Sequence, residues 1–215
     1  MCWSKNVLEE RDAPDQILLG AMDRRYCILL ALGIYLEVWL ETGQGVGNAY
    51  LFGHADLALT NKKYLSDTLK QVWGDPRFLR ATEGPVGTHS NRKWPSTRAR
   101  RNGCLKDDVD HRGRWRKKRV SDRYVDINLP SPDTKVAAAL CVGGPCKYAL
   151  KEGSGVSMLW LREHVVPHLV ASARMQDQVA IVLTKPILWA CFDNSMEGKM
   201  PHGMRNRIRQ AYEAI

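Results

Sequence analysis

The sequence predicts a mainly α-helical fold, and three of its features support this prediction. Apolar residues recur every three or four positions in several segments, which is the spacing of one helix face. Most of these segments end at glycine or at a glycine–proline combination, which stop helices. Strand-like sequence is confined to a short stretch near Tyr50. The 44% apolar content is enough to build a globular core.

The first third of the chain predicts two helices joined by a glycine-rich loop. The first covers residues 17–42, with a break near Asp23, and Gly43 supplies its stop. The second covers residues 64–73 and ends at a Gly-Asp-Pro sequence. The loop between them, residues 43–60, contains the expected small β element.

The middle of the chain predicts shorter helices separated by polar or glycine-containing breaks. Thr88 or Ser90 is suited to cap the first of them, and Gly103 to stop it. Pro95 would kink this helix unless it lies in the first turn. The first of these helices is expected to end at residue 102. The others are expected to cover residues 105–111, 117–127 and 133–142.

The last third predicts three helices and shows little that suggests chemistry. Their expected ranges are 156–173, 176–192 and 204–214, and Pro186 is expected to kink the second. Residues 1–13 show no periodicity and are expected to be loose.

The most apolar segment, residues 26–40, is too short to cross a membrane. It is about 15 residues long and is interrupted by Glu37, whereas a spanning helix needs about 20 apolar residues. We therefore expect a buried core helix here and no integral membrane role.

The excess positive charge of the chain lies in one segment, residues 92–123. This segment holds thirteen Lys or Arg and four Asp, so its net charge of +9 equals that of the whole chain. A concentrated basic surface favours a polyanionic partner.

Cysteine and histidine spacing gives no metal site. The six cysteines are scattered and follow no signal peptide, which favours reduced thiols in a nuclear or cytoplasmic protein rather than a secreted one. Cys141 and Cys146 lack a second ligand pair, and Pro167 separates His164 from His168.

Four residues in or beside the basic segment form a candidate site for phosphodiester chemistry. His89 and Arg92 are three residues apart, which places them on one face of a helix. Trp115 follows His89 by 26 residues, and Tyr124 follows Trp115 by nine. Each feature is common by itself, and their joint spacing carries the interpretation.

Residues 88–93 (THSNRK), 112–115 (RGRW) and 123–125 (RYV) together resemble the C-terminal part of a tyrosine recombinase catalytic domain of the phage-integrase type. Within this family, the sequence is similar to the recombinases of Crypton-type eukaryotic mobile elements. The resemblance implies the helical fold of that domain over residues 14–150, with residues 151–215 as an additional helical extension.

The resemblance also implies a mechanism. Tyr124 would attack a DNA phosphodiester and form a 3′-phosphotyrosine, releasing a 5′-hydroxyl. Arg92 would grip the phosphate and stabilise the transition state. His89 would assist proton movement, and Trp115 would donate its N–H to a phosphate oxygen. No nucleotide cofactor is needed, because the phosphotyrosine conserves the bond energy. No metal is needed either, because the arginines neutralise the phosphate.

Two parts of the family's site are not found. The family uses a second arginine upstream of its HxxR motif and a lysine on a β-hairpin. The surroundings of Arg24 and Arg25 do not match the first, and those of Lys62 and Lys63 do not match the second. The N-terminal DNA-clamping domain is also missing, so we expect inefficient strand transfer by this chain alone.

Duplex DNA is the expected partner, with nuclear localisation, and self-association on DNA follows by analogy through helix 133–142. Eight further cations are expected to contact backbone phosphates: Lys93, Arg98, Arg100, Arg101, Arg116, Lys117, Lys118 and Arg119. Two alternatives stay open. One is a non-catalytic DNA-binding module derived from a mobile element. The other is a helical interaction protein whose basic segment serves nuclear targeting.

Overall fold

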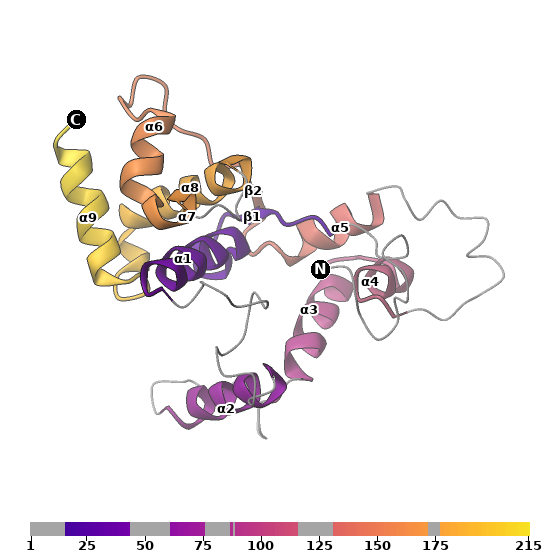
Figure 1. The fold of residues 1–215 in the computed structure, drawn as a ribbon. Helices are drawn as coiled ribbons and strands as arrows, with labels where there is room; N and C mark the ends of the chain where they lie inside the picture. Colours follow the sequence, from indigo (N-terminus) through magenta and orange to yellow (C-terminus); the bar gives the residue numbers. More distant parts are fainter. Residues whose placement is uncertain (1–15, 44–60, 76–86, 88, 116–130, 172–176) are drawn as a thin grey trace.

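The computed structural model describes residues 16–43, 61–75, 87, 89–115, 131–171 and 177–215 (Figure 1). These residues are mainly helical, as the sequence predicts. Their only sheet is one antiparallel pair of two-residue strands, β1 (Gly20–Ala21) and β2 (Pro145–Cys146). The β element expected near Tyr50 and the helix expected at 117–127 lie outside the described residues.

The N-terminal helix is shorter than the sequence predicts. The helix α1 covers Ile28–Glu41, so the prediction of a helix from residue 17 is wrong for its first part. β1 pairs with β2, and a 3₁₀ turn at Arg24–Tyr26 follows, capped by the Asp23 side chain. Residues before Cys27 therefore pair with the distant strand β2 where the sequence predicts a helix. The predicted stop is confirmed, because Gly43 has a φ of 69°.

The larger core joins α1 to helices from the last third of the chain. α1 packs on α7 (Pro167–Ala171) and α8 (Asp177–Cys191), and α9 (His202–Glu213) packs on α8. A Cβ atom on Gly33 would lie 3.0 Å from Cδ1 of Ile187, so α1 and α8 approach closely where α1 has no side chain.

A buried carboxylate fixes α7 against α1. Glu37 is fully buried and accepts hydrogen bonds from the backbone N–H groups of His168 and Leu169, at 3.2 and 2.9 Å. It also lies 2.8 Å from Nδ1 of His168 and 3.4 Å from a guanidinium nitrogen of Arg207. Glu37, which interrupts the apolar segment, thus accepts hydrogen bonds from the free N–H groups in the first turn of α7. It links α1, α7 and α9.

The smaller core is formed by α3 (Ser90–Arg101), α4 (Lys106–Arg112) and α5 (Ser131–Leu140). Its buried side chains are those of Ala99, Cys104, Val109 and Val136. The buried Asp133 pairs with Arg112 at 2.8 Å. Both residues also hydrogen-bond the backbone of Ile17, which attaches the N-terminal segment to this core.

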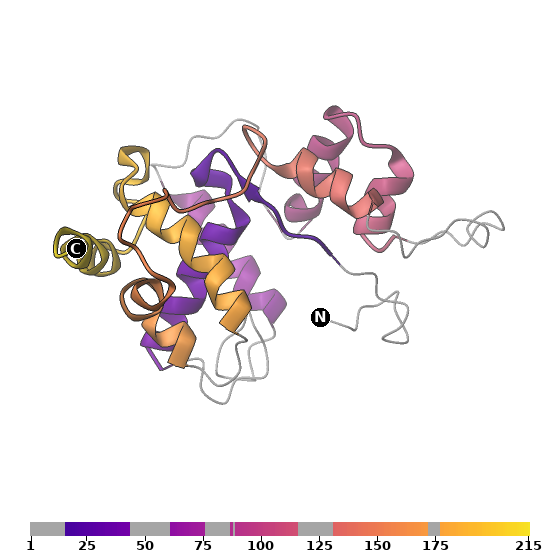
Figure 2. The same cartoon turned by 90° about the horizontal axis from the view of Figure 1, so that it is seen from above.

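The helices around the larger core form the larger group of helices, and α3, α4 and α5 form the smaller group. The extended segment that contains β1 runs between these two groups (Figure 2). The predicted boundary between residues 150 and 151 does not separate these groups, because α1 shares its core with α7 and α8.

The remaining helices follow the sequence prediction with shifted bounds. α2 covers Asn61–Gly74, and none of its described side chains belongs to either core. The helix expected at 156–173 is divided into α6 (Met158–Trp160), a π-helical turn (Leu161–Val165) and α7, which begins at Pro167. Within the described ranges, no helix combines the length and apolar character needed to cross a membrane.

Candidate nucleic-acid interface

The helix α3 carries five of the described cations of the basic segment. It contains Arg92, Lys93, Arg98, Arg100 and Arg101 and no acidic residue. Three of these cations lie in its last turn, where they also complement the negative end of the helix dipole. The helix ends as predicted, with Gly103 at a φ of 85°.

His89 and Arg92 lie together at the first turn of α3. His89 is the N-cap residue, and both side chains are exposed. Arg92 precedes the buried Ala99 by seven residues, so both occupy one face of the helix. The C-terminal half of this face packs on α4 and α5, whereas the N-terminal half projects beyond them (Figure 1). The side chains of Arg92 and Lys93 form no hydrogen bond or ion pair with another described residue, which leaves both free to meet a phosphate.

Trp115 packs in the smaller core and does not lie beside Arg92. It contacts the cluster around Ala99 and Val136, and a Cβ atom on Gly113 would lie 2.8 Å from its ring. Ala99 is about 10 Å along the helix axis from Arg92. The structure therefore brings His89 and Arg92 together and gives Trp115 a packing role. It also explains the Gly113-x-Trp115 spacing, because the ring leaves no room for a side chain at residue 113.

The nucleophile expected from the resemblance, Tyr124, lies outside the described residues. The same holds for four of the expected phosphate contacts, Arg116, Lys117, Lys118 and Arg119.

The other predicted phosphate contacts on α3 divide into two groups. Lys93 and Arg101 are exposed and have no described partner. Arg100 donates to the carbonyl of Cys104 at 2.7 Å, and Arg98 lies over the ring of Trp94. Arg98 and Arg100 therefore also hold the structure of α3 in place.

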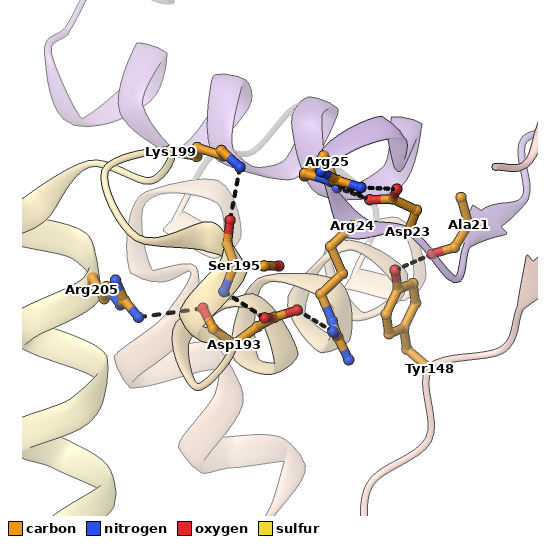
Figure 3. Close-up of polar contacts among 9 residues, drawn as sticks. All are labelled: Ala21, Asp23, Arg24, Arg25, Tyr148, Asp193, Ser195, Lys199 and Arg205. Carbon is orange, nitrogen blue, oxygen red and sulfur yellow. Dashed lines mark hydrogen bonds and ion pairs between the residues drawn. The ribbon is translucent and has the colours of Figure 1, made fainter. Parts of the chain in front are cut away.

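The two arginines considered upstream of His89 lie on the 3₁₀ turn before α1, and each forms an ion pair with an aspartate. Figure 3 shows Arg24 paired with Asp193, and Arg25 paired with Asp23 at 2.7 Å. The guanidinium of Arg24 also lies 5.3 Å from the centre of the Trp189 ring. Lys63 is exposed on α2, and the side chain of Lys62 is not described.

The surroundings of Asp193 form a structural network rather than a reaction site. Its carboxylate caps the 3₁₀ turn Asn194–Met196 by accepting the N–H of Ser195 at 2.8 Å. The hydrogen bonds from Ser195, and then the contact with Arg24, lower the pKa of this carboxyl below its usual value. Arg205 donates to the Asp193 carbonyl (Figure 3). The ion pair between Asp193 and Arg24 thus joins the end of α8 to the segment before α1.

Burial also raises the pKa values of several neutral groups in the cores. Tyr148 donates to the carbonyl of Ala21 at 2.6 Å, and its burial raises its pKa above the ordinary value for tyrosine. Burial raises the pKa of the Cys191 thiol to about 12. These groups stay neutral at physiological pH and serve packing.

No three His, Cys, Asp or Glu side chains among the described residues lie close enough together to hold a metal ion. His168, which the sequence suggests is structural, contacts Glu37. The helix expected to dock on a neighbouring protomer, α5, buries Val136 and Ala137 within its own chain.

Comparisons with protein-family models, with curated proteins and with solved structures found no match to this chain.

Proposed function

We propose that this protein binds duplex DNA through α3 and cuts and rejoins it through Tyr124, in the manner of a tyrosine recombinase. The observation that carries the proposal is the first turn of α3, where His89 and Arg92 are exposed together on a helix with five cations and no acid. The tyrosine spacing that follows in the sequence supplies the nucleophile.

In this mechanism Tyr124 gives up its hydroxyl proton, and its oxygen forms a bond to phosphorus while the bond to the 5′-oxygen breaks. The 5′-oxygen leaves as a hydroxyl after taking up a proton, and His89 is the described group suited to move protons. Arg92 offers two parallel donors to the non-bridging oxygens and stabilises the added charge of the transition state. Attack by the 5′-hydroxyl reverses these steps and rejoins the strand.

A DNA-binding module without catalysis is the second candidate, and two observations favour it. Trp115 packs in the smaller core instead of joining His89 and Arg92. Arg24 and Arg25 are paired with Asp193 and Asp23, so neither offers a free guanidinium to the phosphate. Loss of a phosphate-gripping arginine removes orders of magnitude of rate while leaving affinity for the DNA backbone.

The binding part of the proposal is tested by titrating a fluorescent duplex at several salt concentrations. The logarithm of the association constant should fall linearly with the logarithm of the salt concentration. Arg92→Gln should reduce this slope by about 0.9, the value for one phosphate contact. Arg25→Gln removes the same charge from an arginine paired with Asp23 and should leave the slope unchanged.

The competing interpretation, a helical interaction protein with a targeting segment, gives a different result in the same titration. Heparin would then compete as well as unlabelled duplex, and Arg92→Gln and Arg25→Gln would have equal effects. That outcome would contradict DNA binding through α3. The catalytic part of the proposal is tested by covalent capture of DNA on Tyr124.

A further inference from the structure

We propose that Trp94 and Arg98 form a stacking site for an unpaired nucleobase, so that the protein binds DNA with unpaired bases more tightly than fully paired DNA. This inference rests on the proposed function, because it concerns the same helix and the same polymer. It adds a preference for one form of DNA that neither His89 nor Arg92 would give.

The first observation is the exposure of Trp94. The residue is 53% exposed in the middle of a helix and belongs to neither core. By contrast, Trp39, Trp115 and Trp160 pack against the cores. Exposing a large apolar ring gives α3 no stability, whereas an aromatic ring among cations is the usual platform for nucleobases.

The second observation is the position of Arg98, which holds the indole in place. Its guanidinium carbon lies 5.7 Å from the ring centre of Trp94, one helical turn earlier. Its terminal nitrogen also lies 3.5 Å from the carbonyl of Cys141, just after α5. Arg98 thus connects the exposed ring to the smaller core, and fixing the ring reduces the entropy lost when a base stacks on it.

The third observation is the charge around the ring. Trp94, Arg98 and Arg101 follow at intervals of four and three residues, so they share one face of α3. Arg101 is exposed and has no described partner. A strand with unpaired bases can place its phosphates at Arg101 and a base on the indole. An acidic peptide would meet the cations but would leave the ring without a matching group.

This face is separate from the one that carries Arg92. Residues two apart on a helix point to nearly opposite sides, so Trp94 faces away from Arg92. A change at Trp94 therefore leaves the proposed phosphate site intact, and the two sites can be tested independently.

The experiment compares two fluorescent DNAs of the same length, one fully paired and one with a short unpaired loop at its centre. The wild-type protein should bind the looped duplex about tenfold more tightly, which is the range for one base–aromatic stack. Trp94→Leu should lose this preference and keep the affinity for paired DNA. Trp94→Phe should keep most of it, because a ring remains.

The matched control is Trp189→Leu, with thermal melting to show that each variant is folded. Trp189 is also exposed and also has an arginine over its ring, but it lies in the larger group of helices. This variant should keep the preference for the looped duplex.

Other outcomes would overturn the inference in distinguishable ways. Equal affinity for both DNAs would refute the stacking site and leave the proposed function standing, whereas no binding to either would refute both. A preference that survives Trp94→Leu would show that the base binds elsewhere. Displacement by polyglutamate as efficiently as by single-stranded DNA would show that the face recognises acidic polymers.

Discussion

Removing the Glu37 carboxylate should destabilise the protein far more than removing the carboxylate one turn later on the same helix. In Glu37→Ala, the backbone N–H groups of His168 and Leu169 lose their acceptor, and Arg207 loses a buried partner. Breaking a buried charge network by deleting one partner typically costs about 3–5 kcal/mol. That is a large part of the roughly 5–15 kcal/mol that stabilises a domain of ordinary size.

The matched control is Glu41→Ala. Glu41 contacts the same arginine, at 3.6 Å, but its side chain is 44% exposed. Exposed ion pairs contribute about 0–1 kcal/mol, so this variant should unfold close to the wild type. Urea unfolding followed by circular dichroism gives both free energies from the midpoint and slope. If the two variants lost equal stability, the view that Glu37 anchors α7 on α1 would be refuted.

Four further predictions concern packing, acid stability, thiol reactivity and charge. Gly33→Val should lower the free energy of unfolding by about 1–3 kcal/mol, because α8 leaves no space for the side chain; equal urea midpoints would contradict the close approach. The pKa of Asp193 is lowered in the folded state, so its stabilisation is complete above its unfolded value of about 3.9 and is lost as the pH falls through the folded value. Asp193→Asn should therefore unfold with a weaker dependence on pH below about 4, which acid titration by circular dichroism will measure. A thiol reagent at mildly alkaline pH should modify Cys146 before Cys191, whose burial raises its pKa to about 12; mass spectrometry of the labelled peptides identifies the order. Arg101→Ala should reduce the salt slope of DNA binding by about 0.9, and an unchanged slope would remove Arg101 from the interface.

Local sequence features predicted the helices well where the structure also depends on local features. Residues 28–41 combine an apolar face with a glycine stop, and the structure has a helix that ends before Gly43 with positive φ. The same reasoning placed the end of α3 correctly, at Gly103. Glycine at such a position relieves a conformation that other residues adopt only with strain.

Sequence reasoning failed where distant segments decide the conformation. Residues 17–27 have helical spacing, but Gly20 pairs with Cys146 and Ile17 hydrogen-bonds Asp133. These partners lie more than a hundred residues away, so no local window shows them. The burial of Glu37 was missed for the same reason, because its partners belong to α7 and α9.

The candidate site was anticipated in part. The expectation that His89 and Arg92 share one helix face agrees with their position at the start of α3. The spacing of Trp115 suggested a place beside the phosphate, whereas its ring fills the smaller core. The exposure of Trp94 could not be predicted, because the sequence around an isolated tryptophan in a basic segment does not show whether its ring is buried.

The most direct test of the proposed function is covalent capture of DNA on Tyr124. The protein is incubated with nicked duplexes of random sequence, which trap a 3′-phosphotyrosine, and is then separated on a denaturing gel. The proposal predicts a shifted band with the wild-type protein and with Tyr26→Phe, which removes an exposed hydroxyl outside the basic segment. The band should be absent with Tyr124→Phe, although this variant still binds duplex. A band that survives Tyr124→Phe would contradict the assigned nucleophile, and no band from a protein that binds the same duplexes would contradict DNA cleavage by this chain.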